Sequence, residues 1–362
     1  MKKIFALFFA LCIVLPLSAQ SRGIVIPNLN GYVTLKCDFH THTVFSDGTV
    51  WPTVRIDEAY REGLDAIAIT DHIESWSRPF RNDVVGSHNR SYEIAQAAAR
   101  SRGIILVRGS EITRNMPPGH FNAIFLTDAD ALDKPNYMDV FRAAQAQNAF
   151  IFWNHPQWES QQPDTTLWWP EHTQLLEQGM MHGIEVVNGA YSPEAHSWCL
   201  EKKLTMFGNS DVHEPMQAFS FGNHRTMTLV FARSKTPEAI YEALKERRTA
   251  VYHNEYIIGE EIYLKELFES AVEISVVKTG NTARITFKNK SDLVFNMKEA
   301  SHDERLTYLR NYYNLYPYKI QPQSTQSITV RLNDGIEGGD VNFVVENFLV
   351  KPFTGMIYTV GI

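Results

Sequence analysis

The sequence predicts an α/β domain built on a parallel sheet or barrel, followed by a small all-β domain. Apolar strands alternate with helical segments from Gly31 to Ile258, which is the pattern of repeated βα units. From Val272 onward, apolar and polar residues instead alternate with a period of two, with no helical periodicity of any length. That change predicts a β-sandwich.

The first residues have the features of a secretory signal peptide. Lys2 and Lys3 precede an apolar run from Ile4 to Leu17, and small residues follow before Gln20. The run is short for a membrane span. We therefore expect residues 1–20 to be a signal peptide, and the mature protein to be secreted across the inner membrane into the periplasm without a membrane anchor.

Charge and cysteine content exclude two classes of protein. Loss of Lys2 and Lys3 with the signal peptide changes the formal net charge from −7 to −9. Binding to nucleic-acid duplexes is not expected, because such binding depends on neutralising phosphates with Lys and Arg. Cys37 and Cys199 are too few for a disulfide scaffold. They can pair in an oxidising compartment, but two separate buried thiols are the expected state. Nothing in the sequence indicates the oligomeric state.

In the first domain, residues 21–260, most predicted strands are followed by polar residues. The strands are expected at residues 31–36, 64–70, 104–110, 121–126, 149–153, 183–187, 204–208 and 226–231. Helices are expected at residues 51–63, 91–102, 138–147, around 175–176, 192–203 and 236–248. Gly63 and Gly103 end two of them, and Pro237 begins the last. Active sites of α/β barrels lie at the C-terminal ends of the strands, so the polar residues there are the candidates.

The second domain, residues 261–362, begins with a helix-like segment at 261–269. Strands are expected at residues 272–277, 283–288, 326–331, 340–350 and 355–360, with turns at Gly280 and Gly338. These strands carry no histidines or clustered carboxylates. We therefore expect no catalytic residue beyond about Gly259.

The stretch from Cys37 to Thr49 carries the strongest chemical signal. His40 and His42 stand at the end of a predicted strand, where residues i and i+2 face the same side. Asp47 follows on a loop with Gly48. Two imidazoles and a carboxylate suit a divalent metal such as zinc, manganese or iron. Taken alone, the two histidines are also compatible with a solvent-facing strand edge, although the metal site is favoured.

Other strand ends supply partners for these residues. Six of the thirteen histidines in the chain fall at strand boundaries, together with three carboxylates. The full set is His40, His42, Asp47, His72, Glu111, His120, His155, Asp211 and His213. Nine such residues are too many for one structural zinc, which is closed and commonly Cys-rich. The set fits two or three divalent ions in an open site of the kind that clamps phosphoryl oxygens.

Four ordered motifs resemble those of the PHP (polymerase and histidinol phosphatase) superfamily of metal-dependent phosphoesterases. They are His40-Thr41-His42 with Ser46-Asp47-Gly48, then Thr70-Asp71-His72, Asn154-His155-Pro156 and Ser210-Asp211-Val212-His213. Glu111 and Gly119-His120 match the intervening ligands. The resemblance covers about Gly31 to Ile258, and it implies a distorted (β/α)7 TIM-like barrel with a site for three metals.

The resemblance also implies how the ligands are shared. His40, His42, Glu111 and Asp211 would hold one ion, and Glu111 would bridge to a second ion held by His120 and His155. Asp47, His72 and His213 would hold the third. A metal-bridged hydroxide would attack phosphorus, and Glu111, Asp211 and His213 are the predicted catalytic residues. His120 has a capping role as its alternative.

Several further polar and aromatic residues can be given a predicted role, in most cases with an alternative. Asp71 is expected to orient a ligand rather than bind metal. Asn154, Asn188 and Asn209 either cap turns or touch substrate. Cations at Arg55, Arg78, Arg81 and Arg114 either clamp phosphate or lie on the surface. Trp158, Trp168 and Trp169 fall in an insertion, residues 157–174, that reads as a lid able to stack an aromatic group, whereas Trp153 reads as core. Six further histidines are expected to be structural or surface residues: His88, His172, His182, His196, His224 and His253.

The predicted function is a secreted metal-dependent phosphodiesterase acting on a small-molecule phosphoester. A monoester dianion needs more converging cations than these loops provide, whereas the Trp-rich insertion offers apolar area to a second ester substituent. Two alternatives stay open: a phosphomonoesterase acting on a small phosphorylated metabolite, and a metal-binding protein without catalytic activity.

Overall fold

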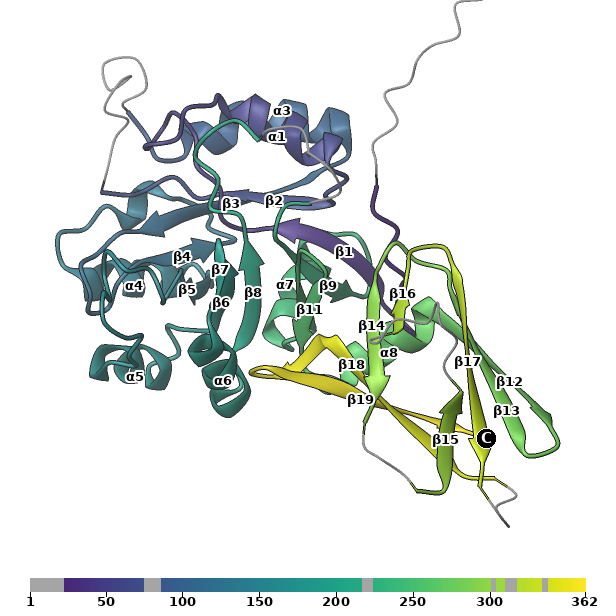
Figure 1. The fold of residues 1–362 in the computed structure, drawn as a ribbon. Coiled ribbons are helices and arrows are strands. Elements are labelled where there is room, and N and C mark those ends of the chain that lie inside the picture. The colour runs from purple at the N-terminus through teal and green to yellow at the C-terminus, as the bar shows by residue number, and fades with distance from the viewer. Residues whose placement is uncertain (1–22, 75–85, 217–223, 301–303, 310–317, 334–337) are drawn as a thin grey trace, which may run out of the picture.

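The computed structural model describes residues 23–74, 86–216, 224–300, 304–309, 318–333 and 338–362. An α/β barrel leads into an all-β domain (Figure 1). The predicted signal peptide, Trp76, Arg78 and Arg81 lie outside the described residues. Among the helices that are described, none is both long and apolar enough to cross a bilayer. Cys37 and Cys199 are buried free thiols.

The barrel contains the predicted alternation of strands and helices. Its strands are β1 (Val33–Asp38), β2 (Ala66–Ile69), β3 (Ile105–Ile112), β4 (Phe121–Ile124), β5 (Phe150–Trp153), β6 (Gly183–Asn188), β7 (Ala190–Tyr191), β8 (Thr205–Asn209), β9 (Met227–Ala232), β10 (Thr249–His253) and β11 (Tyr256–Gly259). Its helices are α1 (Pro52–Arg61), α3 (Arg90–Arg102), the short 3-10 helix η1 (Asp130–Leu132), α4 (Tyr137–Ala146), α5 (Pro170–Glu177), α6 (Pro193–Lys202) and α7 (Pro237–Lys245).

The barrel sheet is parallel-rich rather than parallel throughout. β1–β2, β2–β3, β5–β6 and β6–β8 are parallel pairs, but β4 is antiparallel to both β3 and β5. The link from Thr113 to His120 is shorter than the roughly dozen residues that a parallel crossover needs, so the chain must reverse. The reversal places His120, at the start of β4, beside the C-terminal end of β3.

Side chains make the contact between β8 and the antiparallel pair β9–β10. The Thr228 hydroxyl donates to the Gly208 carbonyl at 2.9 Å and accepts from the Gly208 amide at 3.0 Å. The Thr249 hydroxyl donates to the Met206 carbonyl at 2.9 Å. At position 208 only glycine fits, since a Cβ atom there would lie 2.3 Å from a methyl of Val251. The expected fold class, a distorted TIM-like barrel followed by a β domain, is confirmed.

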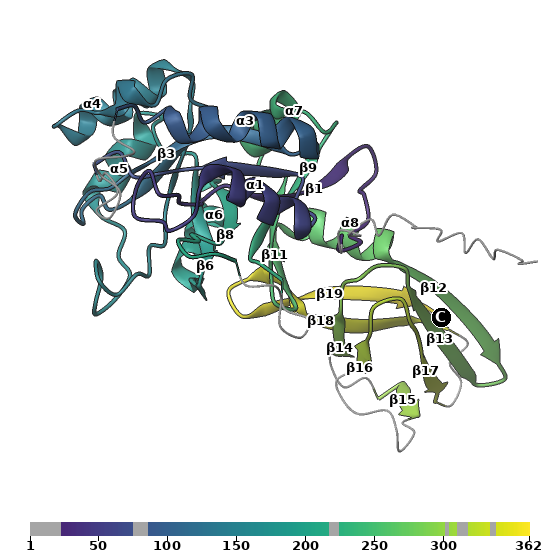
Figure 2. The same cartoon turned by 90° about the horizontal axis from the view of Figure 1, so that it is seen from above.

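Helix α8 (Glu261–Ala271) leads into two packed sheets (Figure 2). One sheet has the order β12-β13-β17-β15, and the other contains β16, β14, β18 and β19. The bounds are β12 (Val272–Thr279), β13 (Thr282–Asn289), β14 (Phe295–Glu299), β15 (Leu306–Leu309), β16 (Tyr318–Ile320), β17 (Thr325–Leu332), β18 (Asp340–Lys351) and β19 (Thr354–Gly361). The strands β14, β15 and β16 were not expected from the sequence, and neither were β7, β10 and β11 of the barrel. β18 also pairs in parallel with β11, with Ile258 opposite Leu349, so the second sheet continues into the barrel sheet.

Candidate metal centre

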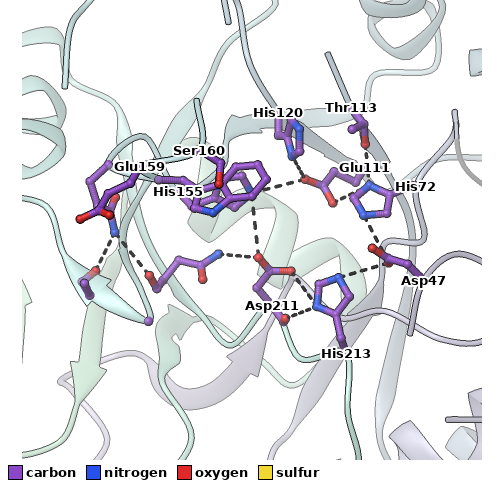
Figure 3. A pocket seen from close by; sticks show the side chains of 15 residues that line it. Asp47, His72, Glu111, Thr113, His120, His155, Glu159, Ser160, Asp211 and His213 are labelled. Atoms are coloured by element: carbon purple, nitrogen blue, oxygen red, sulfur yellow. Dashed lines mark hydrogen bonds and ion pairs between the residues drawn. The ribbon is translucent and has the colours of Figure 1, made fainter. Parts of the chain in front are cut away.

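All nine predicted ligands lie at one edge of the barrel. Strands β1, β2, β5 and β8 run into His40, His72, His155 and Asp211 at their C-terminal ends, and Glu111 lies near the end of β3. His42, Asp47, His120 and His213 come from the adjoining loops. Seven of the nine line a cavity of about 830 Å³ (Figure 3), and His40 and His42 are fully buried behind them. Their side chains form three groups, each compact enough for one metal ion.

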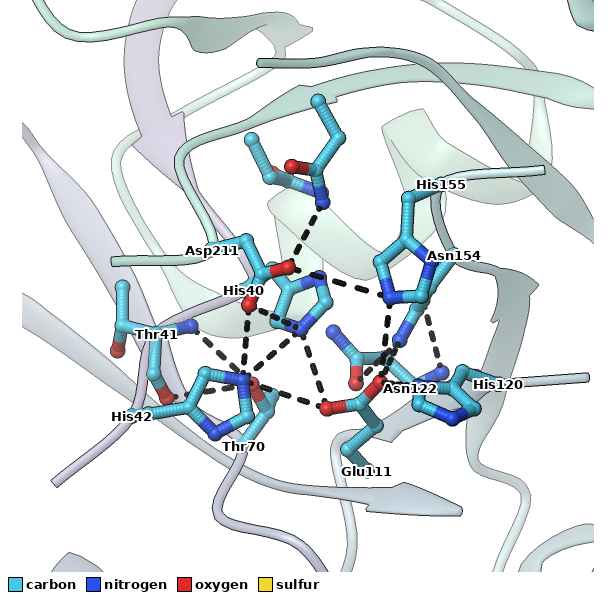
Figure 4. A network of polar contacts seen from close by, with 12 residues as sticks. His40, Thr41, His42, Thr70, Glu111, His120, Asn122, Asn154, His155 and Asp211 are labelled. Atoms are coloured by element: carbon cyan, nitrogen blue, oxygen red, sulfur yellow. Dashed lines mark hydrogen bonds and ion pairs between the residues drawn. The ribbon is translucent and has the colours of Figure 1, made fainter. Parts of the chain in front are cut away.

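The first group is the most buried of the three, although the Asp211 side chain is 20% exposed (Figure 4). The Nε2 atoms of His40 and His42 face each other at 3.1 Å, and Oε2 of Glu111 is 3.3 Å from each. Oδ1 of Asp211 lies 3.1 Å from His40 Nε2 and 3.0 Å from His42 Nε2. Two nitrogen ligands at about 2.0–2.1 Å from one ion are separated by roughly this distance.

The second group uses the other oxygen of Glu111. Its Oε1 atom is 3.0 Å from Nδ1 of His120 and 3.6 Å from Nε2 of His155. The two carboxylate oxygens of Glu111 therefore face different groups, as a bridging ligand requires. Asp211 also extends towards this group, with Oδ2 3.9 Å from Nε2 of His155.

The third group is the most exposed. Oδ1 of Asp47 lies 3.3 Å from Nε2 of His72 and 3.2 Å from Nε2 of His213, and the Asp47 side chain is 51% exposed. Nδ1 of His42 is 3.8 Å from the same oxygen, but it also lies 3.3 Å from the Ser46 hydroxyl. Since that hydroxyl donates to Asp71 at 2.8 Å, it accepts a hydrogen bond from the Nδ1–H group of His42. The Nε2 atom of His42 therefore stays free for the first group.

Hydrogen bonding in the three groups fits cations. Asp211 Oδ1 and His120 Nδ1 are buried without a hydrogen bond although charged partners lie close. Burial alone would raise the pKa of Glu111 and Asp211, but the surrounding histidines, above all His72 for Glu111 and His40 for both, hold both pKa values well below their usual range. Burial would lower the pKa of His42, but Asp211 and Glu111 raise it to about 9. Positive charge is thus favoured among these carboxylates, and divalent cations would supply it.

Glu185 is a site residue that the sequence reasoning missed. Its carboxylate is fully buried on β6 and accepts hydrogen bonds from His40 Nδ1 at 2.8 Å and from the His155 amide at 2.8 Å. Asn209 and Asn188 also donate to it, at 2.9 and 2.8 Å. These bonds fix the His40 tautomer with Nε2 free towards the metal position. The signal was available, because a single carboxylate inside the apolar run 183–187 needs buried partners.

Of the roles considered for Asn154, Asn188 and Asn209, the structure shows a different one: they hydrogen-bond to the metal-ligand residues or to the backbone beside them. Asn154 donates to Glu111 Oε1 at 3.0 Å, and Asn188 donates to Asp211 Oδ2 at 3.3 Å. Asn209 accepts from the Phe39 amide at 2.9 Å. Asp71 orients His42 through Ser46 and accepts from the Thr43 amide and hydroxyl, so it acts on the first motif rather than on its neighbour His72.

Both roles predicted for Arg55 are wrong, whereas for Arg114 only the phosphate clamp finds no support. Arg55 neither clamps phosphate nor lies on the surface, because it is fully buried and donates to the carbonyls of His42, Val212 and His213. It therefore ties the first and fourth motifs together from beneath. Arg114 pairs with Glu74 at 2.9 Å and does not line the cavity.

The predicted lid also needs correction. Trp158 lines the cavity, with its ring 5.4 Å from His120 and 5.2 Å from His155 between centroids. Trp168 instead packs 6.2 Å from the fully buried Trp153 and 5.4 Å from Trp198, and Trp169 immediately precedes α5. The chain turns back onto the barrel wall after Gln162, whose carboxamide binds Trp169 Nε1 at 3.1 Å. Trp168 and Trp169 therefore belong to the wall.

Comparisons with known proteins agree with this architecture. The chain is 51% identical to a two-domain protein from Bacteroides vulgatus ATCC 8482 that contains a predicted PHP-like metal-dependent phosphoesterase; the match covers 95% of this chain and 99% of that one, with a TM-score of 0.90. Residues 270–360 match a family described as an Ig-like domain (DUF5001).

A shorter match links the chain to a nuclease. It is 32% identical over 83 residues to a 5'-3' exoribonuclease of Haemophilus influenzae (strain ATCC 51907 / DSM 11121 / KW20 / Rd). The aligned part covers 23% of this chain and 25% of the length of that curated relative. Because the similarity to the Bacteroides protein extends over nearly the whole of both chains and the four motifs converge at one barrel edge, the chain belongs to the PHP-like metal-dependent phosphoesterases.

Proposed function

We propose that this phosphoesterase is a phosphodiesterase. The observation that supports the proposal is the charge of the cavity. The described residues that line the cavity include no lysine or arginine. They do include four carboxylates, Asp47, Glu111, Glu159 and Asp211. A phosphate diester carries one negative charge and a monoester close to two. A site whose only cations are metal ions, surrounded by carboxylates, favours the monoanion.

The nine ligand residues would hold two or three divalent ions of zinc, manganese or iron. When bound, such ions polarise phosphoryl oxygens and acidify water. Glu111 joins the first two groups, and Glu185 holds His40 in the tautomer that leaves Nε2 free. Asn188 and Asn154 hold the carboxylates of Asp211 and Glu111 in place.

Trp158 would bind the second ester substituent of the substrate. Its side chain is 45% exposed and stands beside the second metal group, where it offers a flat apolar surface. Gln157 next to it is fixed by the Ala190 carbonyl at 2.9 Å, so the loop that carries Trp158 is anchored. The short similarity to the exoribonuclease also supports hydrolysis of a diester.

Paired substrates test the proposal. Bis(4-nitrophenyl) phosphate should be cleaved with a higher kcat/KM than 4-nitrophenyl phosphate by the metal-loaded enzyme. Trp158→Ala should lower kcat/KM for the diester about tenfold, the equivalent of one lost aromatic contact, and change the monoester less. Trp51→Ala is the matched control, because Trp51 is also 45% exposed and does not line the cavity. A monoester preference in the wild type would instead favour the phosphomonoesterase, and metal binding without turnover of either ester would favour the non-catalytic alternative.

We also propose that the protein is exported to the periplasm. The basic and apolar residues before Gln20 support it. Cell fractionation and N-terminal sequencing of the full chain test it, since a mature protein should begin near Ser21. An intact Met1 on the purified protein would exclude cleavage.

A further inference from the structure

A second cavity, of about 570 Å³, lies where the barrel meets the β domain. Its floor is one face of the sheet formed by β10, β11 and β18. His253 pairs with Tyr256 across β10 and β11, and the register of β11 with β18 brings Asn347 beside Tyr256. Two positions further along, Ile258 and Leu349 form an apolar base.

Aromatic side chains stand around this floor. Phe353, at the tip of the β18–β19 hairpin, is 76% exposed, and Tyr256 is 47% exposed. Tyr191 from β7 lies against Phe353, with ring centroids 5.7 Å apart and planes at 87°. Figure 1 shows the hairpin extending from the β domain to the barrel. Exposed aromatic surface gathered in one cavity is typical of a binding site.

The polar groups of the cavity carry almost no free charge. Glu346 is paired with Lys298. His253 is neutral, because one ring nitrogen bonds the Thr226 hydroxyl at 2.7 Å and the other accepts from Asn254 at 2.9 Å. Within the part of the chain that the structure describes, the Asn296 carboxamide and the Tyr256 hydroxyl have no protein hydrogen-bond partner. Both are therefore available to a ligand.

These features select a class of ligand. No lysine or arginine is found among the described lining residues, so a phosphate or another anion lacks a counter-charge. A cation lacks an unpaired carboxylate, because Glu346 is already neutralised. The two lining rings that touch, Tyr191 and Phe353, are perpendicular, so they do not form the parallel slot that clamps a nucleobase. A sugar ring has both an apolar C–H face and hydroxyl groups, which match aromatic surface and free amides. We propose that this cavity binds a neutral saccharide unit.

The cavity adjoins the metal centre. Ala190 lines the metal cavity and Tyr191 lines the second one, so β7 forms the wall between them. β10 is antiparallel to β9, which is antiparallel to β1. His253 at the end of β10 therefore lies at the same barrel edge as His40. The saccharide is either a substituent of the phosphodiester substrate, which rests on the proposed function, or a separate glycan that holds the enzyme in place.

Titration of the full mature protein with maltose, cellobiose, lactose and N,N′-diacetylchitobiose tests the site. At least one disaccharide should bind with a Kd of about 1 mM or tighter. Tyr256→Ala and Asn296→Ala should each weaken it at least about fivefold, as expected for loss of one ring contact or hydrogen bond. Ile357→Ala is the control, because Ile357 on β19 is 58% exposed but outside the cavity, and it should bind normally. Absence of binding by all four sugars, or equal losses in the control, overturns the proposal.

Kinetics then separate the two sources of the sugar. The 4-nitrophenyl phosphodiester of the sugar that binds is compared with bis(4-nitrophenyl) phosphate. If the sugar belongs to the substrate, Tyr256→Ala lowers kcat/KM for the sugar diester alone. If it is a separate glycan, Tyr256→Ala loses binding and keeps both rates. A wild type that binds the sugar but cleaves neither diester refutes the phosphodiesterase and leaves the saccharide site standing.

Discussion

Substitution of Glu185 by glutamine tests whether the metal centre depends on a residue that binds no metal. The Glu185 carboxylate accepts two hydrogen bonds on each oxygen, from His40 and Asn209 on one and from the His155 amide and Asn188 on the other. A carboxamide retains one acceptor oxygen, and its NH₂ group then faces two donors. Two hydrogen bonds to a charged group, at about 1.5–3 kcal/mol each, are lost.

Part of this loss should appear as a lower affinity for the metal ion, because His40 is no longer held in the tautomer that leaves Nε2 free to bind it. Glu185→Gln should weaken binding of the tightest ion about 10- to 100-fold, as measured by competition with a chelator and by elemental analysis. The remainder should appear as a lower free energy of unfolding of the apoprotein in urea.

The control is Glu62→Gln, which removes another carboxylate, 9% exposed and 2.6 Å from Arg225, that pairs with none of the nine ligands. It should lower stability and leave metal affinity unchanged. If Glu185→Gln also loses only stability, with metal affinity within about twofold of the wild type, Glu185 is a packing residue and the positioning argument fails.

Three further predictions follow from burial, charge and strand pairing. Glu111→Ala should abolish turnover and remove more metal than Asp47→Ala, because Glu111 faces two groups and is 1% exposed; near wild-type metal content would refute the bridging role. Truncation after Gly259 should cause aggregation by gel filtration, since β11 loses its partner β18 and becomes an open edge; a monodisperse barrel would contradict this. Burial lowers the pKa of His172 and His196 to about 4. The unfolded chain therefore takes up protons first as pH falls through about 6.5, and stability is lost between about pH 6.5 and 4, by up to about 3 kcal/mol per histidine. His196→Gln should flatten this dependence in urea titrations, and an unchanged slope would count against it.

The local hydrophobic pattern of the sequence predicted most strands and helices of the barrel. The direction and pairing of the strands depend on long-range contacts and were not predicted. Continuous apolar runs such as Ala66–Ile69 mark buried strands wherever they pair, so their existence was readable from the sequence. The direction of β4 was not, because it follows from the short link between β3 and β4 rather than from the composition of either strand. The parallel pair β11–β18 joins residues about ninety positions apart, and no local signal specifies such a contact.

Ligand residues were easier to predict than the residues that support them. Histidines and carboxylates at strand ends are recognisable by type and spacing, and all nine meet at one edge. Arg55 carries the same charge as a surface residue, and only its burial reveals its role. Glu185 was detectable only as a single carboxylate within the apolar run 183–187. The tryptophans show the converse error, since Trp158 and Trp168 look alike in sequence but lie on opposite sides of the turn at Gln162.

The three groups differ in solvent exposure, and loss of an ion should therefore affect the stability of the fold differently in each. In the first group, His40 and His42 are fully buried and Glu111 nearly so, hence a missing cation leaves facing charged groups in a medium that screens them poorly. In the third group, Asp47 is half exposed and His213 one-third exposed, so water can replace a lost ion at small cost. The first group is therefore coupled to the stability of the barrel, since it joins β1, β3 and the end of β8. The third group borders the open cavity, where its ligands can meet substrate.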